Sequence, residues 1–219
     1  MLVNDCMTRH PIMIPPSTLA TEAQKLMSES KVRHLPVVGD GKKLEGLVTR
    51  ERLALKPDIL GSLNVWEITR WLANLRVKDL MLKAKEVHTV SPDRTIERAA
   101  NIMAKRKIGC LPVIEEDTIV AGIITETDLL FAFQEMLGLP MPGVRVTIRM
   151  PDQTGEFAKL TTVLGENKLG VFGIGTFPSP GKTGYYDAVL KIATDDMSEV
   201  KRILSNIPEQ ELIDVRESV

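Results

Sequence analysis

The sequence predicts an α+β protein: two similar β-α-β-β-α units packed as a pair, followed by a smaller β-α-β-β-α-β unit of ferredoxin-like order. Three observations support this prediction. Residues 16–53 align without a gap with residues 92–129, both copies change from helical to strand spacing of apolar residues at matching positions, and the pattern changes after the Gly- and Pro-rich residues 138–143. Two copies are too few for a solenoid, so we expect the copies to pack on each other.

Composition excludes several classes of protein. The 219 residues include 28 Lys and Arg and 29 Asp and Glu, and 43% of residues are hydrophobic. A net charge of −1 gives no general attraction to nucleic acids or acidic membranes. No apolar run approaches the roughly 20 residues of a membrane helix, and the first residues do not resemble a signal peptide. Cys6 and Cys110 cannot build a disulfide framework, so we expect a cytoplasmic protein.

Identical residues at equivalent positions define the repeat. They are Pro16/Pro92, Ala23/Ala99, Met27/Met103, Lys31/Lys107, Leu35/Leu111, Pro36/Pro112, Val37/Val113, Gly46/Gly122, Thr49/Thr125 and Leu53/Leu129. Upstream, Met7 matches Met81 after a small change in loop length. The two copies are therefore predicted to share one local structure.

Each copy is predicted to contain an extended segment, a helix, two strands and a second helix. The apolar stripes of the first helices are Leu19, Ala23, Leu26 and Met27 in one copy and Ile96, Ala99, Ala100 and Met103 in the other. Strands are predicted at residues 35–38, 44–49, 111–114 and 119–125. The second helices start near Thr49 and Thr125.

The segment between the copies has no counterpart after the second copy. It places Val65, Ile68, Trp71, Leu72 and Leu75 at helical spacing. This spacing predicts a short amphipathic helix that covers part of the core or forms a subunit contact. The predicted organisation is repeat 1 at 1–54, a connector at 55–76, repeat 2 at 77–139, a linker at 140–143 and the last domain at 144–219.

The last domain begins with alternating apolar residues. Val144, Val146, Ile148 and Met150 alternate with polar residues, which is typical of an edge-like or half-buried strand. A helix with Phe157, Leu160 and Leu164, two strands over 170–177 and 186–192, a helix around 200–204 and a strand over 212–216 follow. This is the ferredoxin-like order.

Two resemblances cover nearly the whole chain. Leu35-Pro36-Val37-Val38 with Gly46-Leu47-Val48-Thr49, and Leu111-Pro112-Val113-Ile114 with Gly122-Ile123-Ile124-Thr125, resemble a tandem pair of cystathionine-β-synthase-type (CBS) domains, also called a Bateman module. Asp152-Gln153-Thr154-Gly155-Glu156 at the first turn of the last domain resembles an ACT domain. The order CBS-CBS-ACT, with residues 62–68 before the second CBS copy, is similar to that of the acetoin-utilisation AcuB-type proteins.

The sequence offers no catalytic constellation. His10, His34 and His88 lack the spacing of metal ligands, and there is no phosphate loop of the Walker type and no nucleophile elbow. His34 and Cys110 occupy the same position in the two repeats, which suggests one pocket-lining position with two side chains. We therefore predict no enzyme, no metal and no cofactor.

Thr125 and Asp128 have two interpretations. Thr-x-x-Asp is typical of a helix capping box, and a helix N-terminus also suits a phosphate. The resemblance to CBS domains implies that these residues hold the phosphate and ribose of an adenine nucleotide. The nucleotide cleft predicted on this basis contains Thr89, Val90, Ile108, Gly109, Cys110, Leu111, Pro112, Thr125 and Asp128.

The first copy departs from this pattern because it has Arg52 where the second has Asp128. Arginine cannot accept hydrogen bonds from ribose hydroxyl groups, but it can contact phosphate. The cleft predicted for this copy contains Ile14, Arg33, His34, Pro36, Thr49 and Arg52. It is expected to be empty or to hold mainly phosphate.

The first turn of the ACT-like domain has two interpretations, a plain turn or a site for an amino-acid effector, and its residues are Asp152, Thr154, Gly155 and Glu156. A further alternative is that the domain serves to pair sheet edges between two ACT units. The resemblance implies a homodimer. The sequence predicts a regulatory protein that binds AMP, ADP, ATP or S-adenosylmethionine and controls an unidentified partner. A structural dimerisation module without a small ligand remains the alternative.

Overall fold

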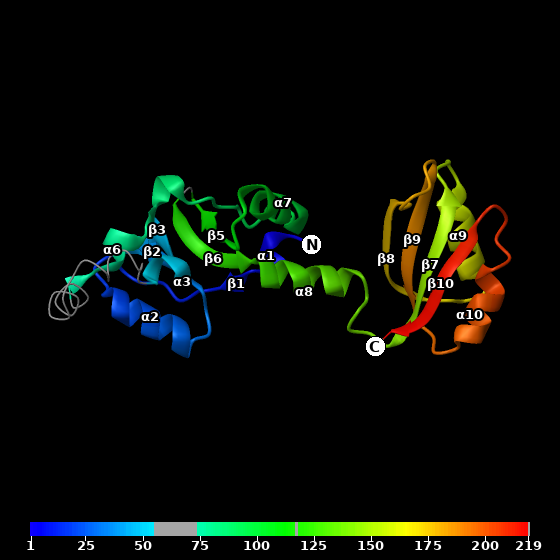
Figure 1. The fold of residues 1–219 in the computed structure, drawn as a ribbon, viewed down its shortest axis with the longest axis horizontal. Helices are drawn as coiled ribbons and strands as arrows, with labels where there is room; N and C mark the ends of the chain where they lie inside the picture. The colour runs from blue at the N-terminus through cyan, green and yellow to red at the C-terminus, as the bar shows by residue number, and fades with distance from the viewer. Residues whose placement is uncertain (55–73, 117, 219) are drawn as a thin grey trace. The chain divides into compact units, whose positions relative to one another are not determined.

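The computed structural model describes residues 1–54, 74–116 and 118–218, and it divides into two compact units, Met1–Leu129 and Leu130–Val219 (Figure 1). The first unit contains α1 (Val3–Cys6), β1 (Thr8–Arg9), α2 (Ala20–Glu29), β2 (His34–Val38), η1 (Asp40–Lys42), β3 (Leu44–Thr49), α3 (Arg50–Leu53), α6 (Val77–Leu80), β4 (Leu82–Lys83), η2 (Ala84–Glu86), α7 (Ile96–Arg106), β5 (Cys110–Glu115) and β6 (Ile119–Thr125). Helix α8 (Glu126–Met136) runs from the first unit into the second.

The two repeats fold alike, as their matching sequences predict. Helix α2 buries Ala23 and Met27 against Leu35 and Val37 of β2. Helix α7 buries the equivalent Ala99 and Met103. Strands β3 and β6 have the bounds that the apolar pattern predicts. The predicted β-α-β-β-α repeat is therefore confirmed.

Each repeat contributes a short strand to the sheet of the other. The sheets have the orders β2-β3-β4 and β1-β6-β5, so β4, which precedes the second repeat, pairs with β3 of the first. A Cβ atom on Gly46 would lie 2.3 Å from the Leu82 carbonyl oxygen, and one on Gly122 would lie 2.6 Å from Met7 Sδ. The identical glycines of the repeat are required because these short strands pass so close.

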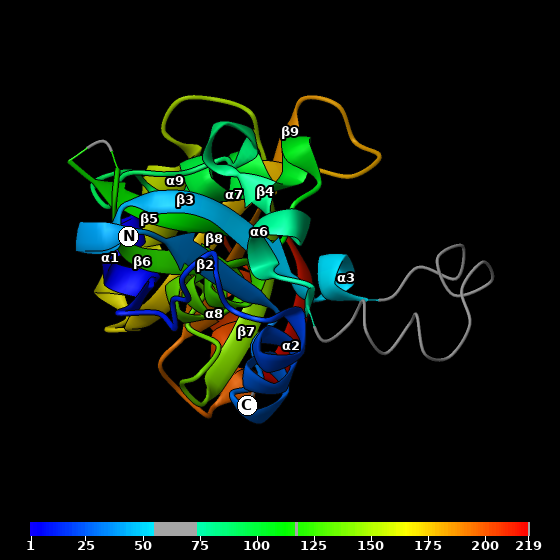
Figure 2. The ribbon, with the colours of Figure 1, turned by 90° about the vertical axis from the view of Figure 1, so that its left-hand side faces the viewer.

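The two repeats pack through their strands. Lys43 and Ile119 form an isolated β-bridge, and the Leu44 amide donates to the Thr118 carbonyl oxygen at 2.9 Å. Leu47 of β3 packs with Cys110 of β5 and with Ile123 in one buried cluster. Figure 2 shows the strands of both repeats side by side. This pairing gives each sheet the cover that a single repeat cannot supply.

The second unit contains β7 (Gly143–Pro151), α9 (Glu156–Glu166), β8 (Val171–Pro178), β9 (Tyr185–Ile192), α10 (Met197–Leu204) and β10 (Glu211–Ser218). These elements follow the predicted β-α-β-β-α-β order. The sheet order is β10-β7-β9-β8, with every neighbouring pair antiparallel. Both helices cover one face, where the alternating apolar residues of β7 and β9 are buried (Figure 1).

Strand β7 meets one of the two alternatives predicted for it. Its alternation gives a half-buried strand, as predicted, but β7 lies between β10 and β9 rather than at an edge. Alternation reports which face is buried and carries no information about the neighbours of a strand.

The predicted connector helix lies outside the described residues except for Leu75, which packs against the core of the first repeat.

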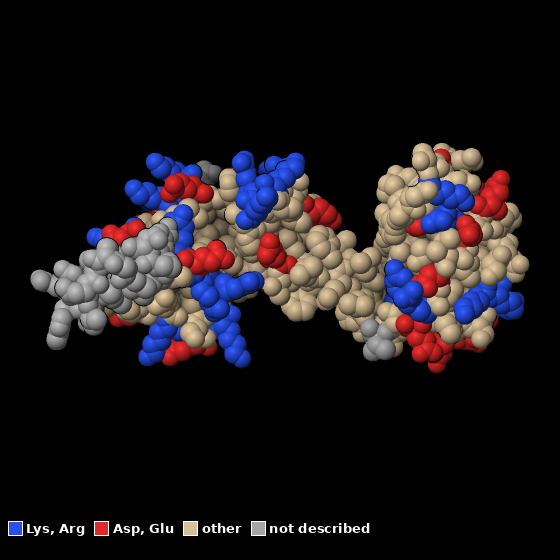
Figure 3. All heavy atoms as spheres, in the orientation of Figure 1, with Lys and Arg blue, Asp and Glu red and all other residues tan. Residues whose placement is uncertain are grey.

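Charges of both signs are interspersed on the face of each unit that Figure 3 shows. This distribution agrees with the net charge of −1. Among the helices that the structure describes, none is long and apolar enough to cross a membrane.

Candidate functional site

Two cavities of the first unit lie at equivalent positions of the repeat. Cleft A, of about 440 Å³, is lined by Arg33, His34, Leu47, Thr49, Arg50, Glu51, Arg52, Leu82, Glu86, Val87, His88, Lys107, Ile108, Gly109, Cys110 and Glu126. Cleft B, of about 380 Å³, is lined by Thr8, His10, Pro11, Ile12, Lys31, Val32, Arg33, His34, Ile123, Thr125, Thr127 and Asp128. Most residues of cleft B have their repeat equivalent in cleft A.

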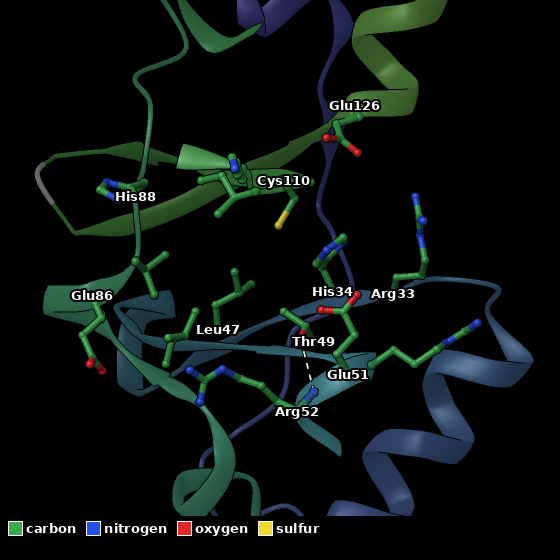
Figure 4. Close-up of a pocket in the computed structure, with 16 residues that line it drawn as sticks. Arg33, His34, Leu47, Thr49, Glu51, Arg52, Glu86, His88, Cys110 and Glu126 are labelled. Carbon is green, nitrogen blue, oxygen red and sulfur yellow. Dashed lines mark hydrogen bonds between the residues drawn. The ribbon is translucent and has the colours of Figure 1, made fainter. Parts of the chain in front are cut away.

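Each cleft combines the helix start of one repeat with the segment that precedes the Leu-Pro-Val strand of the other. Cleft B joins Thr125 and Asp128 to residues 31–34, and cleft A joins Thr49 to residues 107–110. Figure 4 shows Cys110 of the second repeat facing Thr49 and Arg52 of the first across cleft A.

This arrangement differs from the grouping predicted from the sequence, which combined Asp128 with residues 108–112 of its own copy. The segment before β5 contacts the start of α8, since the Glu126 amide donates to the Gly109 carbonyl oxygen at 3.1 Å and Cys110 pairs with Thr125. The same segment also lines a cavity with Thr49 and Arg52 at the start of α3. Ile108, Gly109 and Cys110 therefore belong to the cleft that contains Arg52.

Several other predicted residues line neither cleft. Val90 and Ile14 form β-bridges with Val113 and Val37, and Leu111 is fully buried. Pro36 and Pro112 are buried within β2 and β5, and Thr89 is exposed.

The sequence interpretation missed the segment between Thr8 and Ile12, which forms one wall of cleft B. Strand β1 belongs to this segment and pairs with β6, so the segment reaches the second repeat. The match between Met7 and Met81 is the sequence signal that indicates this strand, because it extends the repeat upstream of the aligned copies.

A reciprocal capping box stands at the start of α8 in cleft B. Asp128 Oδ2 accepts from the Thr125 amide and from the Thr125 hydroxyl group, both at 2.8 Å, and the Asp128 amide donates to Thr125 Oγ1 at 3.3 Å. Within the described residues, Asp128 Oδ1 makes no hydrogen bond. Lys31 and Arg33 line the same cleft, so it offers one free carboxylate acceptor together with basic groups.

Cleft A has a different chemistry at the equivalent position. Thr49 Oγ1 accepts from the Arg52 amide at 3.4 Å, and Arg52 Nη1 donates to the Leu80 carbonyl oxygen at 3.1 Å. The Arg52 side chain therefore binds backbone at the end of α6. Cleft A lacks the carboxylate that cleft B has at this position.

Cys110 and His34 of cleft A are not suited to nucleophilic catalysis. Burial, with Glu126 as a second cause, raises the pKa of the Cys110 thiol to about 12. Burial and neighbouring Arg33 lower the pKa of His34. A neutral buried thiol is a poor nucleophile. No group of three possible metal-ligating side chains occurs in the part of the chain that the structure describes.

The second unit has its own cavity beside the predicted effector residues. Asp152 and Glu156 line a space of about 390 Å³, whereas Thr154 and Gly155 do not. Glu156 accepts from Lys159 Nζ at 2.5 Å and from Gln210 Nε2 at 3.1 Å, and these two contacts lower the pKa of its carboxyl group. Phe157 of α9 is 43% exposed at the same cavity.

The fold and the paired clefts define a CBS-domain pair. The CBS domain family model matches residues 3–56 and 77–135. These two matches span more than half of the chain, one in each repeat. The chain therefore belongs to the CBS-domain family.

Curated relatives match this region. Homoserine O-acetyltransferase of Methanohalobium evestigatum is 34% identical over 128 residues, which are 58% of this chain and 23% of the relative. Inosine-5'-monophosphate dehydrogenase of Korarchaeum cryptofilum is 35% identical over 123 residues, which are 56% of this chain and 22% of the relative. The chain thus spans about a quarter of the length of these relatives.

Solved structures with the same fold include proteins bound to adenine compounds. A putative acetoin utilization protein (AcuB) from Vibrio cholerae is similar with a TM-score of 0.52 and 31% identity, covering 64% of this chain and 95% of that one. The CBS pair of protein MJ0100 was solved in complex with 5'-methylthioadenosine and S-adenosyl-L-methionine. It is similar with a TM-score of 0.50 and 26% identity, covering 61% of this chain and 95% of that one. CBSX2 in complex with AMP is similar with a TM-score of 0.50 and 28% identity, covering 60% of this chain and 95% of that one.

Proposed function

We propose that the CBS pair is a regulatory sensor of an adenine-containing nucleotide, of the AMP, ADP, ATP or S-adenosylmethionine class, and that cleft B is its main site. The observation that carries the proposal is the capping box of cleft B, in which Asp128 keeps one oxygen free beside basic side chains. Similar CBS pairs solved with AMP, or with 5'-methylthioadenosine and S-adenosylmethionine, support it.

The chemistry of cleft B fits the parts of such a ligand. A carboxylate oxygen accepts hydrogen bonds from ribose hydroxyl groups, and Asp128 Oδ1 has no protein donor among the described residues. The first amides of α8 and the cations Lys31 and Arg33 suit a phosphate or a carboxylate of the ligand. A volume of about 380 Å³ lies in the range of small-molecule pockets.

Cleft A is proposed to be empty or to hold mainly an anionic group. Arg33, Arg52 and Lys107 line it together with Glu51, Glu86 and Glu126, and the position equivalent to Asp128 holds Arg52 rather than a carboxylate. Arginine and lysine donate hydrogen bonds and cannot accept them from ribose hydroxyl groups. The two clefts should therefore differ in their preference for a nucleoside.

We propose further that the second unit is an ACT-like domain and that the protein acts as a cytoplasmic homodimer on a partner. The β-α-β-β-α-β order and the cavity beside Asp152 support an ACT-like domain with an amino-acid effector. Glu156, held by Lys159 and Gln210, serves as a structural clamp in this proposal. The exposed apolar residues of edge strand β8 favour the alternative of a structural dimerisation module.

Calorimetric titration of the full chain with AMP, ADP, ATP and S-adenosylmethionine tests the proposal. We expect saturable binding of at least one of these compounds, with one site per chain. Absence of heat for all four, confirmed by an unchanged melting temperature, would leave the dimerisation module as the better account.

A further inference from the structure

A cavity of about 430 Å³ lies in the second unit, on the face of the sheet that α9 and α10 leave uncovered. Its walls are mostly apolar, and the residues that supply them include Leu130, Phe133, Leu137, Leu139, Phe177 and Val189. Arg145 and Lys191 add two basic groups. Among the residues that the structure describes, no acidic side chain lines this space, which we call the α8 cavity.

The sequence of the sheet explains why basic groups reach this face. Leu190 and Ile192 of β9 are buried beneath the helices. Successive side chains of a strand point to opposite faces, so Val189 and Lys191 project to the other side. Arg145 occupies the equivalent place on β7, opposite Lys191 in the antiparallel register.

The end of α8 sits tightly on edge strand β8. A Cβ atom on Gly173 would lie 2.3 Å from the Leu137 carbonyl carbon, and one on Gly138 would lie 2.8 Å from Phe172 Cβ. Gly138 also has φ +71°. Both contact positions therefore need glycine, which indicates that α8 is fitted to this strand and that the cavity beside it is a built feature of the unit.

Lys191 is an unusual wall residue because it is only 3% exposed. Its ammonium group donates to the Ser218 carbonyl oxygen, and no carboxylate of the described residues forms an ion pair with it. On the same face, Arg149 has Asp187 as a bidentate partner at 2.8 and 3.1 Å. Burying an ammonium group without a counterion is costly. Burial accordingly lowers the pKa of Lys191.

We propose that the α8 cavity binds an aliphatic monocarboxylate, with the carboxylate on the ammonium group of Lys191 and the hydrocarbon chain along the apolar wall. The anion would supply the missing counterion, and Arg145 lies beside it with a side chain that Asp214 already holds at 3.3 Å. An amino acid fits less well, since none of the described residues that line the cavity has an acidic side chain to receive its ammonium group.

The test uses the full chain, with octanoate as probe and octanamide as its neutral equivalent. We expect octanoate to bind saturably in calorimetry and octanamide to bind at least tenfold more weakly, because only the acid makes the charge-assisted contact. Lys191→Met should weaken octanoate binding at least tenfold. This variant should fold, since replacing a buried charge with an apolar side chain of similar size is often neutral or stabilising.

Two further variants make the test decisive. Leu139→Glu places a carboxylate in the cavity at a residue that is 41% exposed, so it should fold and should also weaken octanoate binding. Lys182→Met removes a cation that is 43% exposed and lines no part of the cavity, and it should bind as the unmodified chain does. No binding of octanoate, equal binding of octanamide, or unchanged binding by Lys191→Met or Leu139→Glu would overturn the proposal.

Discussion

Thr125 Oγ1 lies 2.8 Å from Asp128 Oδ2 at the start of α8, and this contact leaves the second carboxylate oxygen without a partner among the described residues. The equivalent pair in the first repeat, Thr49 and Arg52, keeps only the backbone half of the capping interaction. Helix capping and ligand recognition therefore use the same residues in cleft B. In cleft A the residue equivalent to Asp128 binds backbone instead.

An Arg52→Asp substitution should give cleft A a carboxylate at the position equivalent to Asp128. Thr49 already occupies the position equivalent to Thr125, so the new carboxylate should complete a second capping box. We expect calorimetry with the adenine nucleotide that binds best to change from one site per chain to two. Arg52→Ala should leave one site with affinity within about twofold, since it adds no acceptor. A second site in Arg52→Ala, or none in Arg52→Asp, would contradict this account of the asymmetry.

Gly122→Ala should destabilise the first unit. A Cβ atom there would lie 2.6 Å from Met7 Sδ and 2.9 Å from the Thr8 carbonyl oxygen, so β1 or its neighbours must move. Overpacking of this kind costs about 1–3 kcal/mol. Urea denaturation measures the loss.

Gly165→Ala is the matched control, because a Cβ atom on this glycine of α9 meets nothing within 4 Å. Alanine is favoured over glycine in a helix by up to about 1 kcal/mol, so this variant should be as stable as the unmodified chain or more stable. If both variants had equal stability, the exchange of short strands between the repeats would lose its support.

Cys110 should resist alkylation. Burial raises the pKa of its thiol to about 12, so it stays protonated at pH 8, and only the thiolate reacts readily. Mass spectrometry after iodoacetamide treatment should find Cys110 unmodified in the native protein and modified in denaturant. Rapid native labelling of Cys110 would show that cleft A is open to this residue.

The same pKa predicts a pH dependence of stability. The unfolded thiol ionises near its ordinary pKa of 9.0, below the folded value of about 12. The neutral thiol therefore makes its full contribution to the free energy of unfolding below pH 9, and this contribution declines as the pH rises toward 12. Cys110→Ala should remove this part of the decline in the free energy of unfolding. If the free energy of unfolding of Cys110→Ala varied with pH as it does in the unmodified chain, the raised pKa of Cys110 would be contradicted.

Local patterns in the sequence predict most of the fold. The repeat and its alternating apolar residues place β3 and β6 at their observed bounds, because those patterns reflect burial on one or two faces of a strand. They also give the order of elements in the second unit. The interior position of β7 was not predictable in this way, since alternation is the same for edge and interior strands.

The composition of the clefts depends on contacts between repeats, which local patterns do not encode. Residues 108–110 and Asp128 belong to one repeat, yet they line different cavities. The choice follows from how the repeats pack, through Leu47, Cys110 and Ile123. The sequence therefore predicted Thr125 and Asp128 as candidate residues, but it did not predict that residues 31–34 of the other repeat line the same cavity.

Asp128→Ala tests whether Asp128 holds the ligand as well as capping α8, with Glu22→Ala as the matched control. Glu22 accepts from the Leu19 amide at 3.2 Å in the capping box of α2 and lines neither cleft. Loss of a capping interaction costs about 1 kcal/mol, so both variants should have lower melting temperatures.

The deciding measurement is the dissociation constant of the best-binding adenine nucleotide for these two variants. A hydrogen bond to a charged group contributes roughly 1.5–3 kcal/mol, so Asp128→Ala should bind at least tenfold more weakly than the unmodified chain, whereas Glu22→Ala should bind equally well. An unchanged dissociation constant for Asp128→Ala would contradict the account and leave Asp128 as a helix cap alone.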